Sequence, residues 1–244
     1  MNVETRIEKL TKKFESFVDK YYKNPFSGPS VYFHGRVLYM IRNTKDYREL
    51  LEKEDMFIER IYATLASWGM HRMTKSALLE DFENFKQNIR SNIDTLEKLT
   101  KFKLHELDDN DKEKIKPTLS NLFENLEIMK KETKNPEVME RPKLVGNSKT
   151  LHHLLPDLIP PIDRRHTINF FYKEKFVKEL YIPKSEEKQK DMFLEVFDGF
   201  YLICKKVDRI ETIYWKRKNK ENFTTSIPKL IDNAIIGYVR ENRR

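Results

Sequence analysis

The sequence predicts an all-α protein, a multi-helix globular bundle, and two observations lead to that class. Apolar residues recur at steps of three and four along most of the 244 residues, which is the period of an amphipathic helix. Six glycines in the whole chain, with no phosphate-binding glycine loop among them, argue against a dinucleotide-binding α/β fold. A hydrophobic content of 39% is enough to bury a substantial core, as one large domain or as two small ones.

Four helical regions are expected in the first hundred residues. The first has one apolar face and stops in the loop 24–29; the third ends at Gly69, a natural C-terminal stop; the fourth carries a continuous apolar stripe from Leu78 to Leu96. These helices are predicted over residues 7–21, 31–40, 55–68 and 75–99.

An acidic loop at 108–111 and Pro117 are expected to separate the fourth helix from another over 119–129. Asn135-Pro136 then opens the approach to a central segment. These breaks between helices allow the chain to divide into an N-terminal helical region, 1–134, and a C-terminal helical region, 135–244. The two regions can also form one compact domain.

Two helices are expected after the central segment. Ser185 can begin a helix that buries an apolar face from Met192 to Cys204. The last helix is predicted to begin at Thr225 or Ser226, with Pro228 in its first turn, where a missing N–H is harmless. The only candidate strand is the short run 210–215.

The central segment, residues 144–167, concentrates the most chemistry. Gly146 is interpreted as a loop residue, and Asn147 or Ser148 as the N-cap of a short helix that ends at Pro156. Lys149 would then lie in the first turn, where the helix dipole repels an ammonium group. It would therefore project to solvent, bind an anion, or have its proton affinity lowered toward that of an amine nucleophile.

A second helix start follows in the same segment, which thus resembles a helix-turn-helix. Pro160 and Pro161 hold an extended approach to Asp163. Asp163 is placed to cap a helix that begins at Arg164.

This arrangement resembles the helix-hairpin-helix DNA glycosylase superfamily, over about a tenth of the chain. The hairpin's second glycine is missing, Leu151 replaces a small residue, and Lys149 and Asp163 are 14 positions apart, fewer than is usual in that family. The segment is also similar to uncharacterised all-helical proteins with an SK-x-LHH…PPID signature, a resemblance that implies no activity. The pieces that match the glycosylases are Leu144-Val145-Gly146, Lys149-Thr150 and Pro161-Ile162-Asp163-Arg164-Arg165-His166.

The glycosylase resemblance implies a catalytic pair. Lys149 would attack the sugar C1′ of a flipped nucleotide and form a Schiff base, while Asp163 would orient the lysine and stabilise the developing positive charge. Each residue also has a purely structural interpretation. Asp163 can serve only as a helix cap, Lys149 as a solvated lysine, and Arg164 with Arg165 as one charged helix face.

The charge balance favours an anionic partner. A net charge of +8 and a pI near 9.2 suit nucleic acid, with DNA the expected form, although 39 acidic residues are interspersed among the 47 basic ones. The run Trp68-Gly69-Met70-His71-Arg72-Met73 offers either a stacking surface or core packing, and the run 215–220 either phosphate contacts or a solvated loop. The candidate nucleic-acid contacts are Arg72, Ser148, Arg164, Arg165, His166, Lys216 and Arg217.

Several other classes of site are disfavoured. Cys204 is the single cysteine, which excludes an intrachain disulfide and a cysteine-rich zinc site and fits a reducing, cytoplasmic compartment. His152 and His153 diverge by about 100° on one helix, so no metal site is expected, and no cofactor is expected either. Neither a signal peptide nor an apolar run of about 18 residues is present, so we expect no membrane partner. The oligomeric state is left open.

Three functions are therefore considered. The first is a DNA base-excision glycosylase or lyase that uses Lys149 and Asp163. The second is a nonenzymatic helical protein that binds DNA or RNA. The third is a helical scaffold in which the central segment only joins one helix to the next.

Overall fold

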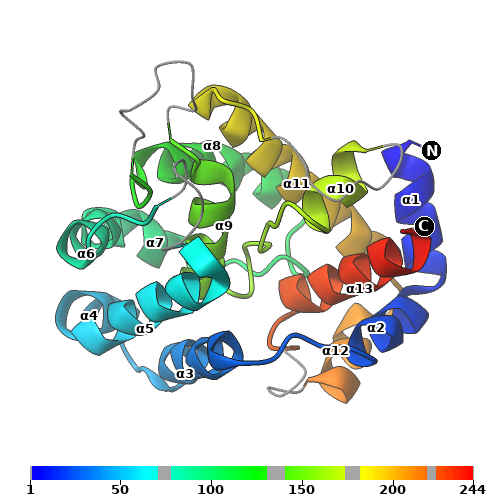
Figure 1. Ribbon diagram of the computed structural model, residues 1–244, viewed down its shortest axis with the longest axis horizontal. Coiled ribbons are helices and arrows are strands. Elements are labelled where there is room, and N and C mark those ends of the chain that lie inside the picture. The colour runs from blue at the N-terminus through cyan, green and yellow to red at the C-terminus, as the bar shows by residue number, and fades with distance from the viewer. Residues whose placement is uncertain (1, 71–77, 131–140, 174–181, 219–223, 244) are drawn as a thin grey trace.

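Helices form the regular secondary structure of the part of the chain that the structure describes. The computed structural model describes residues 2–70, 78–130, 141–173, 182–218 and 224–243 (Figure 1). Within these ranges there are thirteen α-helices and one π-helical turn, and an isolated antiparallel bridge pairs Leu79 with Met129. The predicted all-α class is confirmed.

In chain order the elements are α1 (Val3–Lys12), α2 (Phe14–Tyr22), α3 (Pro29–Asn43), α4 (Tyr47–Lys53), α5 (Asp55–Leu65), η1 (Ala66–Met70), α6 (Phe82–Arg90), α7 (Ile93–Leu99), α8 (Asp109–Asn125), α9 (Lys143–Leu154), α10 (Thr167–Tyr172), α11 (Glu186–Lys206), α12 (Ile210–Arg217) and α13 (Ile227–Asn242).

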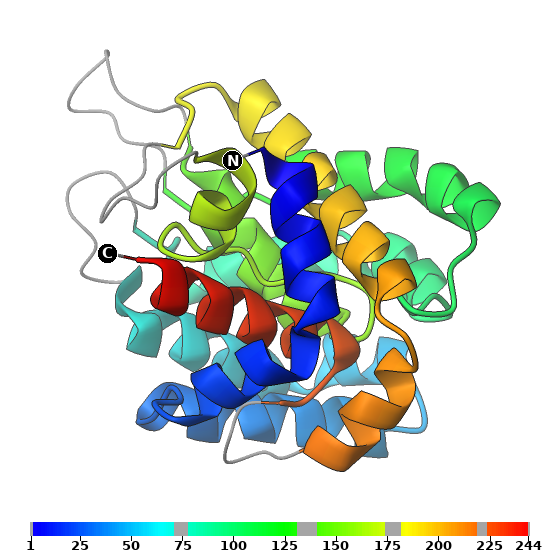
Figure 2. The same cartoon turned by 90° about the vertical axis from the view of Figure 1, so that its right-hand side faces the viewer.

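Two predicted helices are each divided in two. The helix expected over 7–21 breaks at Lys13, whose φ of −124° and ψ of 31° are not helical, so α1 and α2 meet there at an angle (Figure 2). Of the helix expected over 75–99, residues 75–77 lie outside the described residues and 78–81 are not helical. α6 begins after Asp81, whose carboxylate accepts a hydrogen bond from the N–H of Asn84 at 3.1 Å, and the helix breaks again before α7. The spacing of apolar residues therefore continues unchanged across the breaks between α1 and α2 and between α6 and α7, so it does not reveal them.

The acidic run 108–111 is a helix start and not a loop. Asp108 accepts a hydrogen bond from the N–H of Asp111 at 2.7 Å, and acidic side chains are stabilised at the positive end of a helix dipole. Pro117 lies inside α8. The strand considered at 210–215 is wrong, because these residues belong to α12, whereas the predicted N-caps at Ser185 and Ser226 are confirmed.

The helix α9 lies at the centre of the molecule, in contact with α3, α5, α8 and α11 (Figure 1). On the other side α13 packs along α2, and a Cβ at Gly237 would overlap the carbonyl oxygen of Phe17, so only glycine permits this close approach. One hydrophobic core contains buried residues from Ile7 to Val239 and runs across the boundary considered at residue 135. None of the described helices is long and apolar enough to cross a membrane.

Candidate active site around Lys149

The side chain of Lys149 projects from the middle of α9. Because α9 begins at Lys143, Lys149 is two turns from the helix start, and its placement in a first turn was wrong. Asn147 and Ser148 lie inside the helix and do not cap it. Gly146 is also helical, and it is needed because a Cβ there would lie 2.6 Å from the Met129 sulfur. Residues 144–146 therefore do not form a hairpin loop before the lysine.

The segment between α9 and α10 crosses back over α9 and brings Asp163 to Lys149. This segment is hydrogen-bonded to α9 through Ser148, whose hydroxyl accepts a hydrogen bond from the backbone N–H of Ile162 at 3.2 Å. Asp163 Oδ1 accepts a hydrogen bond from the His166 N–H at 2.7 Å, and Oδ2 lies 3.2 Å from His166 Nδ1. Asp163 thus caps a turn, as expected, but α10 begins three residues later than predicted, at Thr167.

A second charged pair comes from α13, which sequence reasoning missed. Lys229 and Asp232 are separated by one helical turn, and Lys229 Nζ is hydrogen-bonded to Asp232 Oδ2. Both residues are 3% exposed. Every residue from Ile227 to Val239 is buried, and charged side chains are rarely placed in a helix that is buried on all sides. This burial is a tertiary effect, so the sequence alone contains no signal of the pair.

Aromatic rings border these charges. Lys149 Nζ lies 4.5 Å from the centre of the Trp68 ring, and Lys229 Nζ lies 5.7 Å from the centre of the Phe26 ring. Phe26 also meets the His166 ring edge-on, with centroids 6.3 Å apart. Trp68 and Phe26 are each partly exposed, as are Lys149 and Asp163.

The electrostatics of Lys149 follow from burial. Removal of its ammonium from water lowers the pKa, and the negative charges of Asp163 and Asp232 offset this only in part. The side-chain amine of Lys149 forms neither a hydrogen bond nor an ion pair with any described residue, whereas the Lys149 backbone carbonyl lies 2.7 Å from His153 Nδ1. A desolvated amine without a committed partner is the state in which a lysine acts as a nucleophile.

The two carboxyl groups have pKa values that are moved in opposite directions. Burial alone would raise the pKa of Asp163, but the hydrogen bonds from His166 and the charge of Lys149 hold it below its ordinary value. Burial and the nearby charge of Asp163 raise the pKa of Asp232, although Lys229 opposes that rise. Asp163 is therefore the ionised carboxylate of the site, and Asp232 is the one that binds a proton more readily.

Three buried histidines lie behind Lys149, and we call His34, His152 and His153 the histidine cluster. His34 Nδ1 lies 3.0 Å from His153 Nε2, and His34 Nε2 lies 2.8 Å from the Thr225 hydroxyl. Burial lowers the pKa of all three imidazoles, that of His153 to about 4. Among the described residues, no group of three or more His, Cys, Asp or Glu side chains is placed to hold a metal ion.

The predicted nucleic-acid contacts fall into three groups. Arg164 and Arg165 are exposed on the turn that follows Asp163, so they adjoin the site. Ser148 is fully buried and His166 is 5% exposed, and both have internal partners. Lys216 and Arg217 do not join the site, because Lys216 is exposed on α12 and Arg217 on α12 pairs with Glu15 and Asp19. Arg72 lies outside the described residues.

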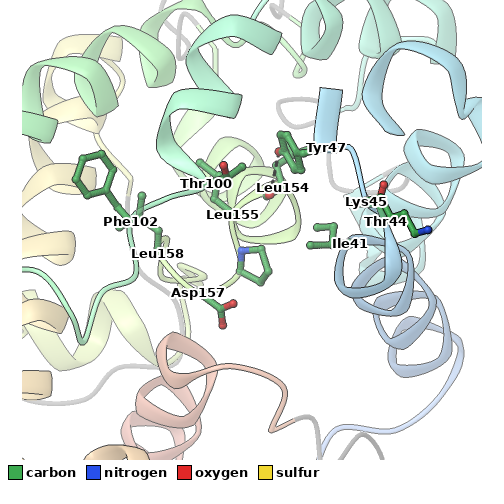
Figure 3. A pocket seen from close by; sticks show the side chains of 11 residues that line it. Ile41, Thr44, Lys45, Tyr47, Thr100, Phe102, Leu154, Leu155, Asp157 and Leu158 are labelled. Atoms are coloured by element: carbon green, nitrogen blue, oxygen red, sulfur yellow. Dashed lines mark hydrogen bonds between the residues drawn. The ribbon is translucent and has the colours of Figure 1, made fainter. Parts of the chain in front are cut away.

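A cavity of about 250 Å³ lies at the other end of α9 (Figure 3). Its lining comes from the end of α3, the start of α4, the turn after α7 and residues 154–158. The Tyr47 hydroxyl on its wall donates a hydrogen bond to the Leu154 carbonyl at 3.0 Å. Lys149 and Asp163 are not among the lining residues, so this cavity is separate from the lysine site.

Comparison with known proteins found no matching family model, no matching curated protein and no matching solved structure.

Proposed function

We propose that the protein acts on nucleic acid as a base-excision glycosylase or lyase, with Lys149 as the amine nucleophile. The observation that carries this proposal is the environment of Lys149: its amine is desolvated, lies against the Trp68 ring, and interacts with two carboxyl groups without forming an ion pair with either. An exposed or ion-paired lysine would be protonated near neutral pH and could not attack carbon.

The reaction needs three events at the sugar. The Lys149 amine forms a bond to C1′, the bond from C1′ to the base breaks, and the base leaves with the bonding electron pair and takes up a proton. The bond between C1′ and the ring oxygen then breaks, the ring oxygen takes up a proton that the nitrogen releases, and the nitrogen and C1′ form a Schiff base. Positive charge develops on the sugar and the nitrogen during these events, and the ionised Asp163 is placed to stabilise it.

The surroundings favour a nucleic-acid substrate. Arg164 and Arg165 are exposed beside Asp163, where guanidinium groups can bind phosphates and hold the strand in place. The partly exposed aromatic side chains of Trp68 and Phe26 are of the type on which an extruded base stacks. The net charge of +8 adds an attraction that depends on salt. The resemblance to the helix-hairpin-helix glycosylases is limited to Lys149 and Asp163, because residues 144–146 belong to α9 and do not form a hairpin.

Borohydride trapping tests the proposal. Purified protein is incubated with duplex DNA that contains an abasic site or an oxidised base, and borohydride reduces any Schiff base to a stable covalent adduct. We expect an adduct with wild-type protein and with Lys98→Ala, which removes an exposed lysine on α7, but none with Lys149→Ala. Salt-dependent DNA binding without any adduct would contradict the enzyme and support the nonenzymatic nucleic-acid-binding function.

A further inference from the structure

We infer that the outer faces of α3 and α12 form a binding surface for single-stranded nucleic acid, built from residues other than those around Lys149. The inference rests on the nucleic-acid part of the proposed function, and it adds the form of nucleic acid that is bound and the residues that hold it. Both helices lie along the lower edge of the molecule in Figure 1. We call Tyr32, Arg36 and Tyr39 on α3, with Trp215 and Lys218 at the end of α12, the aromatic track.

Three large aromatic side chains of the aromatic track are exposed to solvent. Tyr32 is 64% exposed, Tyr39 is 49% exposed and Trp215 is 65% exposed. Exposed apolar side chains that are scattered singly are ordinary, whereas a group of them on one surface marks a site of interaction. A ligand that stacks on these rings removes their apolar area from water.

The α3 residues of the aromatic track form one row. Tyr32, Arg36 and Tyr39 follow each other at steps of four and three positions, so they lie on one face of the helix. The two tyrosines are about 10 Å apart along the helix axis, which is far enough for two different bases to stack on them. The guanidinium carbon of Arg36 lies 5.5 Å from the centre of the Tyr39 ring. A cation between the two rings is placed to bind the phosphates that join such bases.

The row continues from α3 to α12 through Arg42. Arg42 lies one turn after Tyr39, and its guanidinium group donates a hydrogen bond to the Tyr214 hydroxyl at 3.3 Å. The Tyr214 and Trp215 rings are in contact, with centroids 5.6 Å apart, and Lys218 Nζ lies 4.5 Å from the centre of the Trp215 ring. Rings and cations therefore alternate across both helices.

The charge along the aromatic track is positive. The sequence of α3 contains no Asp or Glu. In α12 the only acidic residue is Glu211, and its Oε1 lies 3.9 Å from His105 Nε2. Lys216 is exposed next to Trp215 and adds a further cation. Exposed rings flanked by cations suit a polyanion with planar bases, whereas an apolar protein surface would leave these cations without counter-charges.

The aromatic rings favour a single strand over a duplex. In a duplex the faces of the bases are stacked on each other, so exposed side-chain rings can stack only on unpaired bases. Such stacking accepts every base, and phosphate contacts carry no sequence information. The aromatic track therefore binds single strands without sequence preference.

Fluorescence anisotropy of a labelled oligothymidylate measures this binding, because the probe forms no duplex. We expect Tyr39→Ala and Trp215→Ala each to raise Kd by about 5- to 150-fold, through the loss of one stacked base. Tyr39→Phe should bind as the wild type does, because stacking needs the ring and not the hydroxyl. The matched control is Tyr172→Ala, which should leave Kd unchanged: Tyr172 is an exposed aromatic residue on α10, and its hydroxyl is hydrogen-bonded to the acidic Glu195.

The salt dependence of Kd separates stacking from charge. Lys218→Gln should reduce the slope of log Kd against log salt concentration by about 0.7, the value for one phosphate of a single strand. Tyr39→Ala should weaken binding without a change in this slope. The inference would be overturned by an unchanged Kd in both alanine variants, by Tyr39→Phe binding as weakly as Tyr39→Ala, or by a wild-type protein that does not bind the probe.

Failure of this inference is distinguishable from failure of the proposed enzyme. Lys149→Ala should bind the oligothymidylate as the wild type does, because Lys149 is not part of the aromatic track. Binding that depends on Tyr39 and Trp215, without any borohydride adduct, would remove the enzyme and support the inference. A Lys149 adduct together with Kd values that neither alanine variant changes would support the enzyme and remove the inference.

Discussion

Replacement of Lys149 by methionine should stabilise the protein, because the charged Lys149 side chain lowers the free energy of unfolding. The lowered pKa of Lys149 means that its charged form interacts less favourably with the folded protein than its neutral form does. This net direction already includes the attraction of Asp163 and Asp232. Methionine has a similar length, carries no charge and can keep a favourable contact with the Trp68 ring.

The size of the effect follows from linkage. Each unit by which folding lowers the pKa of a lysine destabilises the charged state by about 1.4 kcal/mol. The penalty is complete below the folded-state pKa and disappears above the unfolded-state value of about 10.4, where the lysine is neutral in both states. Lys149→Met should therefore raise the unfolding free energy at pH 7 by about 1 kcal/mol, and the melting temperature by about 2–4 °C. The difference from wild type should shrink as the pH rises toward 10.

Lys143→Met on the same helix is the matched control. Lys143 is buried, whereas Lys149 is half-buried, and Lys143 Nζ lies 2.8 Å from Glu186 Oε2 and donates a hydrogen bond to the Glu124 carbonyl at 2.6 Å. Its loss should destabilise the protein by about 1–3 kcal/mol, because hydrogen bonds to a charged group are broken. Urea unfolding of both variants between pH 7 and pH 10 measures the contrast. If Lys149→Met were destabilised as much as Lys143→Met, Lys149 would be a structural residue and this reasoning would be refuted.

Gly237→Ala should destabilise the protein by about 2 kcal/mol or more, because its Cβ would overlap the α2 backbone, whereas Gly35→Ala has open space and should stabilise α3 by about 0.5–1 kcal/mol; thermal unfolding compares them, and equal effects would contradict the packing. Acidification from pH 6.5 toward pH 4 should lower the free energy of unfolding, because the histidine cluster binds protons in the unfolded state and not in the folded state. His153→Gln should make the free energy of unfolding depend less on pH. Urea midpoints of the wild-type protein that do not change with pH would disprove this prediction. Ser148→Ala should cost about 1–2 kcal/mol by leaving the Ile162 N–H unpaired, and an unfolding free energy within error of wild type would show that this bond is dispensable.

The sequence predicts those features of the fold that depend on local chemistry. The caps at Ser185 and Ser226 and the hydrogen bond from the His166 N–H to Asp163 are formed by side chains next to the backbone groups they satisfy. No residue near Lys13 predicts the break between α1 and α2, because the spacing of apolar residues continues across it. Gly146 was misread for a related reason: its lack of a side chain makes room for Met129, which is distant in sequence, and has nothing to do with a turn.

The candidate site could be predicted only in part. Lys149 and Asp163 lie in one segment that returns over its own helix, so sequence proximity brings them together. Lys229 and Asp232 come from the far end of the chain and reach the site only because α13 is buried along its whole length. The long-range packing that delivers them, and the burial that changes their proton affinities, are tertiary effects that a local pattern does not contain.

The most direct test of the central claim is to identify the residue that carries the trapped sugar. Wild-type protein is reduced with borohydride on abasic duplex DNA, the DNA is digested, and the modified peptide is sequenced by mass spectrometry. The account predicts a single modification, on the Lys149 side chain, and its loss in Lys149→Met, which keeps the fold. A modification spread over exposed lysines, or one retained in Lys149→Met, would contradict amine catalysis at this site.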